Sequence, residues 1–293
     1  MEQYSEKKQI LIADVCLLFA AMFWGGGFIA ADIAVVHFTP FYLIAMRFCL
    51  ASVLIYFLFR RHVHHAGKGE LVGGVVIGSI MFFMLPFQVI ALRYTTPSKQ
   101  AFILAMYVAI VPLLSWLVSK KKPSLQTLVS GLIVIFGVGI IALTDTFTIA
   151  LGDALSLVGA FAYALVVVAT GYFVTKHNPF AISFYSYLTT GVLALVFALL
   201  FEEMPTAFPK EGVLGVLYLA IINTTVAYTL QNFAQKYTSD SHAAILVSTE
   251  SVFAFVFSIM LFGEAFTWRV LIGGLVVFVG VILSQLKIGK KTS

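Results

Sequence analysis

Two charged side chains lie in the middle of long apolar segments of this sequence. Glu250 lies within the segment 240–262, and Arg47 lies within the segment 40–59. A charge inside a bilayer is costly, so the few that occur there usually serve a function. Because burial disfavours the ionised form of a carboxylate, we expect Glu250 either to carry a proton exchanged during transport or to bind a cationic substrate group. The alternative is a protonated or paired carboxyl that only braces helices.

Arg47 also has two interpretations. Its guanidinium could contact a substrate or form part of a gate, or it could satisfy backbone carbonyls at a helix break and hold its helix in place. An ion pair between Arg47 and Glu250 is compatible with the sequence, which does not place the two segments relative to each other. Both residues are therefore candidate coupling or gate residues.

A polar face runs along the apolar segment 211–237. Its side chains recur every three or four residues, as they do on one face of a helix. They are Thr224, Tyr228, Gln231, Asn232 and Gln235. Such a face cannot favourably contact lipid, so it either lines a cavity or makes hydrogen bonds between helices. The number of amides favours a cavity, in which Gln231, Asn232 and Gln88 would supply hydrogen bonds to a substrate.

Four aromatic residues lie deep within apolar segments rather than near the ends, where membrane proteins carry their aromatic belt. They are Trp24, Tyr107, Tyr163 and Tyr228. Because aromatic faces attract cations, we expect these rings to shape a substrate cavity. The alternative is ordinary packing between helices.

The composition indicates what must position these side chains. Of the 293 residues, 61% are hydrophobic and 11% are charged, and the mean hydropathy is +1.02. A span needs roughly 20 apolar residues, and ten such segments can be recognised. They cover residues 10–32, 40–59, 71–93, 97–119, 125–144, 152–174, 179–201, 211–237, 240–262 and 266–286. The sequence therefore predicts an all-α polytopic membrane protein with ten transmembrane helices.

The sequence lacks the motifs that are typical of several classes of enzyme and ATP-driven transporter. The sequence contains no HExxH, GxSxG or P-loop motif, and its two cysteines, Cys16 and Cys49, both lie inside predicted spans. We therefore expect no enzymatic activity, no cofactor and no metal site. The formal net charge of +5 comes from basic residues in loops, so we expect no nucleic-acid partner.

The distribution of basic residues predicts the topology. If the amino terminus is cytoplasmic, thirteen of the 18 Lys and Arg residues fall on the cytoplasmic side, and Arg47 lies within a span. The other four, on the opposite side, are Arg93, Lys99, Lys210 and Arg269. By the positive-inside rule, we expect a multi-pass protein of the plasma membrane with both termini in the cytoplasm.

The sequence contains an internal repeat, with a first copy over residues 1–146 and a second copy over residues 147–293. Pro40-Phe41 recurs as Pro179-Phe180, and Arg93-Tyr94-Thr95 recurs as Lys236-Tyr237-Thr238. With five spans in each repeat, the second repeat enters the membrane from the opposite side, as in many secondary transporters.

The alignment of the two repeats pairs some candidate residues and separates others. Trp24 pairs with Tyr163, and Gln88 pairs with Gln231, whereas the partners of Arg47 and Glu250 are Ser186 and Val108. We expect the kept pairs to form cavity walls. The unmatched charges would provide the difference between the halves that a directional transporter needs.

Several short motifs occur in a fixed order along nearly the whole chain. They are Phe23-Trp24-Gly25, Ala45-Met46-Arg47-Phe48, Tyr94-Thr95-Thr96-Pro97-Ser98, Gly152-Asp153 and Glu250-Ser251-Val252-Phe253-Ala254. In these motifs the chain resembles the EamA-type permeases of the drug/metabolite transporter superfamily. The resemblance implies ten helices in an inverted five-plus-five repeat, with a central cavity formed mainly by helices other than the fifth and tenth. It also implies movement of small metabolites, amino acids or organic cations, often as export.

These observations together predict a secondary transporter that moves a small metabolite, such as an amino acid, outward by alternating access. The transporter could be coupled to protons, and its substrate could instead be a small organic cation or drug. A second class of function is an uncoupled facilitator. A third class is a membrane protein that transports nothing, such as a lipid-handling enzyme or an assembly partner. The expected partners are a small-molecule substrate, the lipid bilayer and protons, and the expected state is a monomer or weak homodimer.

Overall fold

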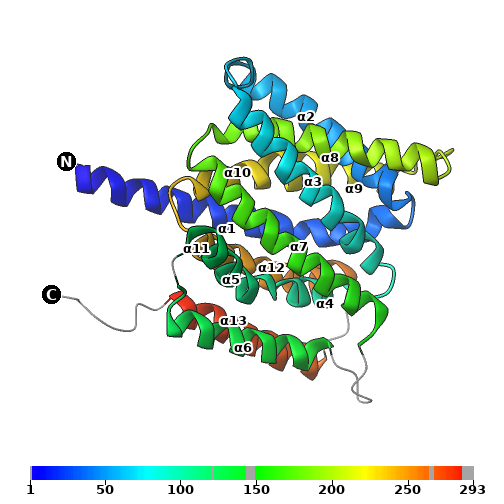
Figure 1. The fold of residues 1–293 in the computed structure, drawn as a ribbon. Helices are drawn as coiled ribbons and strands as arrows, with labels where there is room; N and C mark the ends of the chain where they lie inside the picture. The colour runs from blue at the N-terminus through cyan, green and yellow to red at the C-terminus, as the bar shows by residue number, and fades with distance from the viewer. Residues whose placement is uncertain (1, 121, 143–148, 264–266, 286–293) are drawn as a thin grey trace.

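The fold is a bundle of long helices that lie side by side, as the computed structural model shows for residues 2–120, 122–142, 149–263 and 267–285 (Figure 1). The first repeat contains α1 (Glu2–Val35), α2 (Pro40–His64), α3 (Lys68–Ala91), α4 (Pro97–Leu104), α5 (Tyr107–Ser119) and α6 (Leu125–Ala142). The second contains α7 (Leu151–Val174), α8 (Pro179–Phe201), α9 (Lys210–Tyr218), η1 (Leu219–Val226), α10 (Ala227–Gln235), α11 (Asp240–Ser248), α12 (Glu250–Phe262) and α13 (Trp268–Gln285). The predicted boundary between residues 146 and 147 lies outside the described residues.

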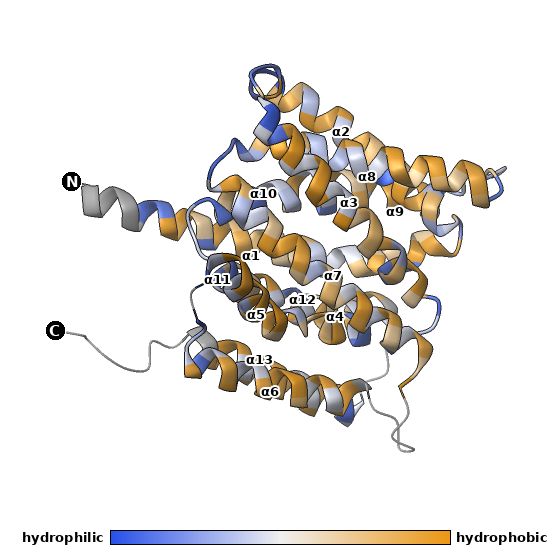
Figure 2. Cartoon of the chain, viewed as in Figure 1, coloured by the Kyte–Doolittle hydropathy of each residue, from blue (hydrophilic) through white to orange (hydrophobic). Residues whose placement is uncertain are grey.

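The helices have the length and composition that crossing a membrane requires. Within the described part of the chain, eight are long and apolar enough to span a bilayer. Two shorter apolar helices, Leu125–Ile141 and Trp268–Leu283, bring the number of predicted spans to ten. Apolar residues cover the helices and polar residues gather at their ends (Figure 2), because a bilayer cannot solvate exposed polar groups. The ten-helix polytopic fold expected from the sequence is confirmed.

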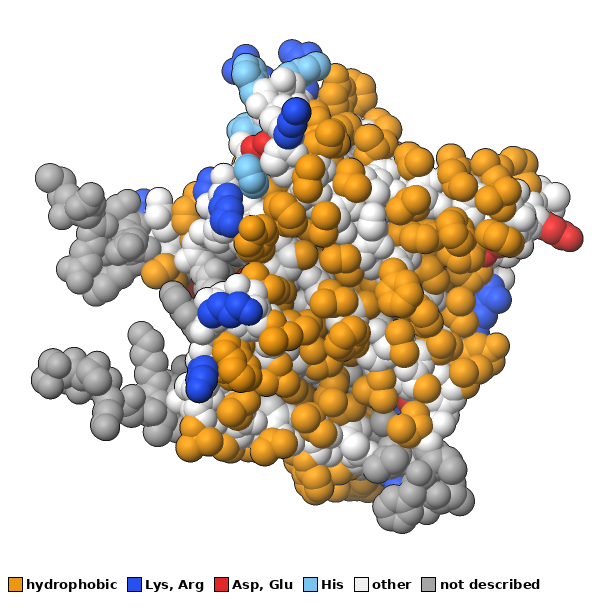
Figure 3. Space-filling view, in the orientation of Figure 1, with side chains coloured by type: hydrophobic (Ala, Val, Ile, Leu, Met, Phe, Trp, Pro, Cys, Tyr) orange, Lys and Arg blue, Asp and Glu red, His pale blue; other side chains and the backbone are white. Residues whose placement is uncertain are grey.

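Basic side chains gather at one end of the bundle, on the side where the amino terminus lies (Figure 3). We call this end the basic face. At the basic face α1, α3 and α11 begin and α5, α7 and α10 end, as the chain order of the antiparallel spans requires. The predicted concentration of Lys and Arg on one side of the membrane corresponds to this face.

Three predicted spans are not single α-helices. The span 97–119 is divided into α4 and α5, the span 240–262 is divided into α11 and α12, and the span 211–237 contains the π-helical segment η1. At the first two breaks the backbone tightens, because the amides of Val108 and Val252 bond to carbonyls three residues earlier. Neither break contains Pro or Gly, so the sequence carries no local signal for it.

The first helix of each repeat packs against helices of the other repeat. Helix α1 contacts α9, η1, α10, α11 and α12, and we call these six elements the α1 group. Helix α7 contacts α3, α4 and α5, and we call these four the α7 group. Helices α2 and α8 pack on each other, while α6 and α13 form a pair at one edge of the bundle (Figure 1).

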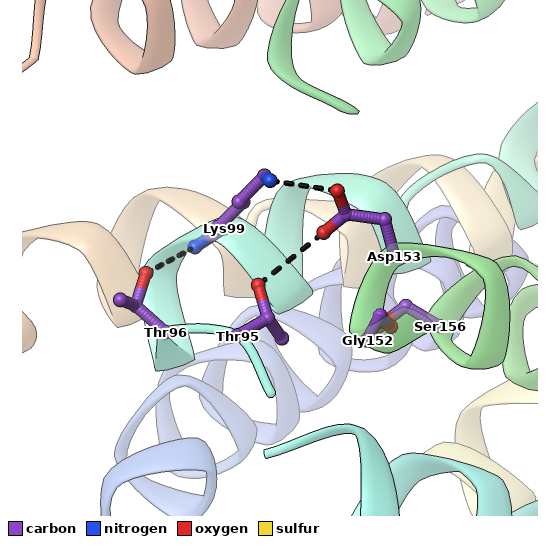
Figure 4. Close-up of polar contacts among 6 residues, drawn as sticks. All are labelled: Thr95, Thr96, Lys99, Gly152, Asp153 and Ser156. Atoms are coloured by element: carbon purple, nitrogen blue, oxygen red, sulfur yellow. Dashed lines mark hydrogen bonds and ion pairs between the residues drawn. The ribbon is translucent and has the colours of Figure 1, made fainter. Parts of the chain in front are cut away.

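In each group, a carboxylate of the first helix contacts a basic side chain of another helix near one end. In the α7 group, Lys99 Nζ lies 2.7 Å from Asp153 Oδ2, and Thr95 Oγ1 donates a hydrogen bond to Asp153 Oδ1 (Figure 4). In the α1 group, His242 Nε2 lies 2.8 Å from Asp14 Oδ1. Asp14 and Asp153 are equivalent in the repeat, so both repeats use the first carboxylate of their first span to hold another helix of the same group.

Candidate functional site

A cavity lies between the two groups. Six of the residues predicted for the site line it, and α6 and α13 contribute none of its lining. The six are Trp24, Arg47, Gln88, Tyr163, Tyr228 and Glu250. From Glu250 the lining extends to Ala31, Leu92 and Gln100, near the end of α1 and the loop between α3 and α4. The cavity therefore extends away from the basic face.

Trp24 is the centre of an aromatic cluster on the cavity wall. Its ring lies edge-on to Tyr163, with centroids 6.0 Å apart, and to Tyr228, with centroids 4.7 Å apart. Tyr107 packs edge-on against Tyr163, with ring centroids 4.7 Å apart. Edge-to-face packing of this kind stabilises aromatic clusters, so the wall is a preformed surface. Tyr107 itself supports this wall from behind and does not line the cavity.

The break between α11 and α12 positions Glu250. It is the first residue of α12, its side chain is buried, and it lines the cavity. The helix dipole favours a negative charge at this end, and the carboxyl also faces Tyr107. Oε1 makes no hydrogen bond to any described residue. One carboxylate oxygen is therefore available to a ligand or a proton.

Arg47 is held in place by the π-helical segment. Its Nε donates to Thr224 Oγ1 at 2.5 Å, and its Nη2 donates to Asn223 Oδ1 at 2.5 Å. An arginine has five N–H donors, so the guanidinium can still donate to a ligand. Arg47 and Glu250 line the same cavity but form no ion pair with each other in the described structure.

Asn223 connects these parts of the site. Its backbone carbonyl accepts a hydrogen bond from Trp24 Nε1 at 2.9 Å, and its Nδ2 donates to the Phe23 carbonyl at 3.2 Å. A Cβ at Gly27 would overlap the Asn223 amide, so this contact requires glycine. Asn223 and Gln100 line the cavity but were not among the predicted site residues. The signal for Asn223 was the run Asn223-Thr224-Thr225 within an apolar span.

The polar face of the span 211–237 is divided between two roles. Tyr228 lines the cavity, whereas Asn232 Nδ2 donates to Ser183 Oγ at 2.8 Å and joins α10 to α8. Gln231 is fully buried beside Tyr163 and does not line the cavity either. A π-helical turn contains more residues than an α-helical turn, so the positions that follow η1 are rotated away from a single α-helical face.

Comparison with known proteins identifies relatives over the whole length of the chain. A model of the EamA-like transporter family matches residues 11–143 and 150–286. An uncharacterized transporter of Archaeoglobus fulgidus is 31% identical over 280 residues, which cover 95% of this chain and 87% of that protein. A second from the same organism is 26% identical over 291 residues, covering 97% and 99%.

A bacterial relative and a solved structure extend the comparison. The uncharacterized transporter YyaM of Bacillus subtilis is 24% identical over 284 residues, with 92% of each chain covered. One crystal structure matches 93% of this chain and 96% of its own, with a TM-score of 0.74 and 17% identity. At that identity the likeness shows a shared fold alone.

Proposed function

Since the chain belongs to the EamA-like transporter family, we propose that it is a secondary transporter that moves a small metabolite across the membrane by alternating access. The resemblance seen in the sequence is confirmed, and the chain is a non-enzymatic membrane transporter. The substrate class, the direction and the energy source are the parts of the proposal that go beyond the family.

The observation that carries the proposal is the placement of two buried side chains of opposite charge, Arg47 and Glu250, on one cavity between the two helix groups. Arg47 would bind an anionic part of the substrate, and Glu250 would bind a cationic part or a proton. The aromatic wall around Trp24 would contact the apolar part. Discontinuous helices often build such sites in transporters, and Glu250 begins one half-helix just as Tyr107 begins the other.

An amino acid or a similar small molecule fits this arrangement, and we propose that it is exported from the cytoplasm. The distribution of basic residues supports a cytoplasmic basic face in the plasma membrane. The cavity extends toward the opposite face, from which an exported substrate would leave.

The decisive experiment is flux in liposomes that contain the purified protein. A thermal-shift screen of amino acids, nucleobases and quaternary amines selects compounds, and their flux is then measured with and without a pH gradient. We expect at least one zwitterionic or cationic compound to be transported faster when a pH gradient is imposed. Flux that is insensitive to pH and membrane potential would indicate an uncoupled facilitator. Absence of flux for every stabilising compound would contradict the proposal.

A further inference from the structure

Asp240 connects the two helix groups at the basic face. It is the first residue of α11, in the α1 group, and its Oδ2 accepts a hydrogen bond of 3.1 Å from Ser115 Oγ on α5, in the α7 group. Gln235, at the end of α10, donates through Nε2 to the Val167 carbonyl of α7 at 3.0 Å. The same Nε2 lies 3.4 Å from Asp240 Oδ1. These contacts join the two groups across the end of the pathway opposite the cavity.

The backbone of α7 leaves room for the Asp240 carboxylate. A Cβ at Gly171 would overlap Oδ1 of Asp240, so the carboxylate lies directly against a helix of the other group. Ser115, Gly171 and Asp240 also line a surface depression on the basic face. The contact is thus at the junction between aqueous solution and the closed part of the protein.

The repeat indicates which residues near the Asp240 contact are equivalent to residues that line the cavity. Under the sequence alignment of the repeats, Ala31 and Leu92, which line the cavity, correspond to Thr170 and Gln235. Thr170 is 1% exposed and Gln235 is fully buried. Because an inverted repeat exchanges the roles of its halves when access alternates, Thr170 and Gln235 are the positions expected to line a cavity open to the basic face.

We propose that Asp240 is a latch that closes the transport pathway at the basic face, and that its release exposes Thr170 to solution. This inference rests on the proposed alternating access. The contact between Asp14 and His242 lies at the same end of the bundle but within the α1 group. It therefore does not restrain one group against the other, and it provides a matched control.

The test uses a cysteine reporter at position 170. Cys16 and Cys49 are replaced by Ala, Thr170→Cys is introduced, and the purified full-length protein is placed in lipid nanodiscs. Alkylation by a charged, water-soluble maleimide is then followed over time. We expect Asp240→Ala to raise the alkylation rate by about tenfold, because it removes a charge-assisted hydrogen bond between the groups. Asp14→Ala should leave the rate unchanged.

Ser115→Ala provides a second variant that removes only a hydroxyl from the opposite helix. It should raise the rate in the same direction but by less, which separates release of the latch from misfolding of one mutant. The inference is overturned if neither Asp240→Ala nor Ser115→Ala raises the rate. It is equally overturned if Asp14→Ala raises the rate as much as Asp240→Ala, since the effect would then be general loosening.

The assay needs no substrate, so its failure can be separated from failure of the proposed function. If Asp240→Ala exposes Thr170 while the unmodified protein transports no compound, the latch stands and the transport proposal fails. If flux is measured but Thr170 stays equally protected in every variant, the transport proposal stands and the latch is wrong.

Discussion

The two buried charges of the cavity are kept apart by their own partners. Arg47 is bound by Asn223 and Thr224, while Glu250 begins α12 and faces Tyr107. Each charge can therefore act on a different chemical group, instead of neutralising the other.

Glu250→Gln tests whether the carboxyl exchanges a proton. The amide keeps the shape of the side chain but cannot be ionised, so we expect flux driven by a pH gradient to fall to the level seen without a gradient. Substrate binding, followed by thermal shift, should remain measurable. Glu203→Gln, in an exposed loop, is the matched control and should behave as the unmodified protein. Undiminished proton-driven flux in Glu250→Gln would remove the coupling role.

Arg47→Lys tests whether the site requires a guanidinium that donates from two nitrogens to two separate acceptors. An ammonium group cannot reproduce two bonds from Nε and Nη2 to two acceptors, and each hydrogen bond to a charged group contributes roughly 1.5–3 kcal/mol. We expect a lower unfolding temperature and weaker substrate binding.

Arg93→Lys is the control for that substitution. Arg93 is exposed and donates one long hydrogen bond of 3.5 Å to the Val35 carbonyl. Its replacement should change neither the unfolding temperature nor binding. Equal effects of the two substitutions would show that Arg47 has no special position.

Among the elements, η1 has the largest influence on the site. One π-helical segment supplies both acceptors of Arg47 and the carbonyl that binds Trp24. π-helical turns occur frequently at functional sites. The equivalent span of the first repeat, α3, is a continuous α-helix that runs through Pro86, so the π-helical segment occurs in only one of these two equivalent spans.

Gly27→Ala tests the contact between α1 and η1. The added Cβ would displace the Asn223 amide, so we expect a lower unfolding temperature and reduced flux. Gly139→Ala on α6 is the matched control, because a Cβ there meets no atom within 4 Å. That substitution should be neutral or stabilise the helix by up to about 1 kcal/mol. If the two variants unfold at the same temperature, the close packing of Gly27 is unimportant.

For the whole molecule, the exchange of α1 and α7 between the repeats creates the two groups that would move against each other in the proposed alternating access. The contacts of Asp14 with His242 and of Asp153 with Lys99 lie within groups, whereas the contact of Asp240 with Ser115 joins the two groups. Motion of one group against the other would keep the first two contacts and break the third. The helices that each carboxylate joins therefore distinguish contacts within a group from a contact between the groups.

The orientation of the molecule in the membrane is tested with two exposed positions on opposite faces. Glu203→Cys lies opposite the basic face, and His65→Cys lies on it. In a background without Cys16 and Cys49, a membrane-impermeant maleimide added to intact cells should label Glu203→Cys only. His65→Cys should react once the membrane is permeabilised. The reverse pattern would place the basic face outside and contradict the positive-inside assignment.

Periodicity and composition were sufficient to predict the ten spans, because lipid imposes its requirements on each segment separately. Recurring short motifs indicated the two repeats, and the resemblance of several motifs to the EamA-type permeases indicated the family. The same local reasoning identified Trp24, Arg47, Gln88, Tyr163, Tyr228 and Glu250, which all line the cavity. A charge or an aromatic ring deep in a span is visible without knowledge of its neighbours. Their roles toward a substrate stay predictions.

Other features depend on contacts between segments far apart in the chain. The helix breaks before Tyr107 and Glu250 contain no Pro or Gly, and η1 arises where Asn223 meets Gly27 of another helix. Asn232 bonds to Ser183 instead of lining the cavity, and Asp240 bonds to Ser115, 125 residues away. Residue types and their spacing reveal that a polar group must be satisfied inside the membrane. Which helix satisfies it follows from packing, because the free energy of such a bond depends on both partners.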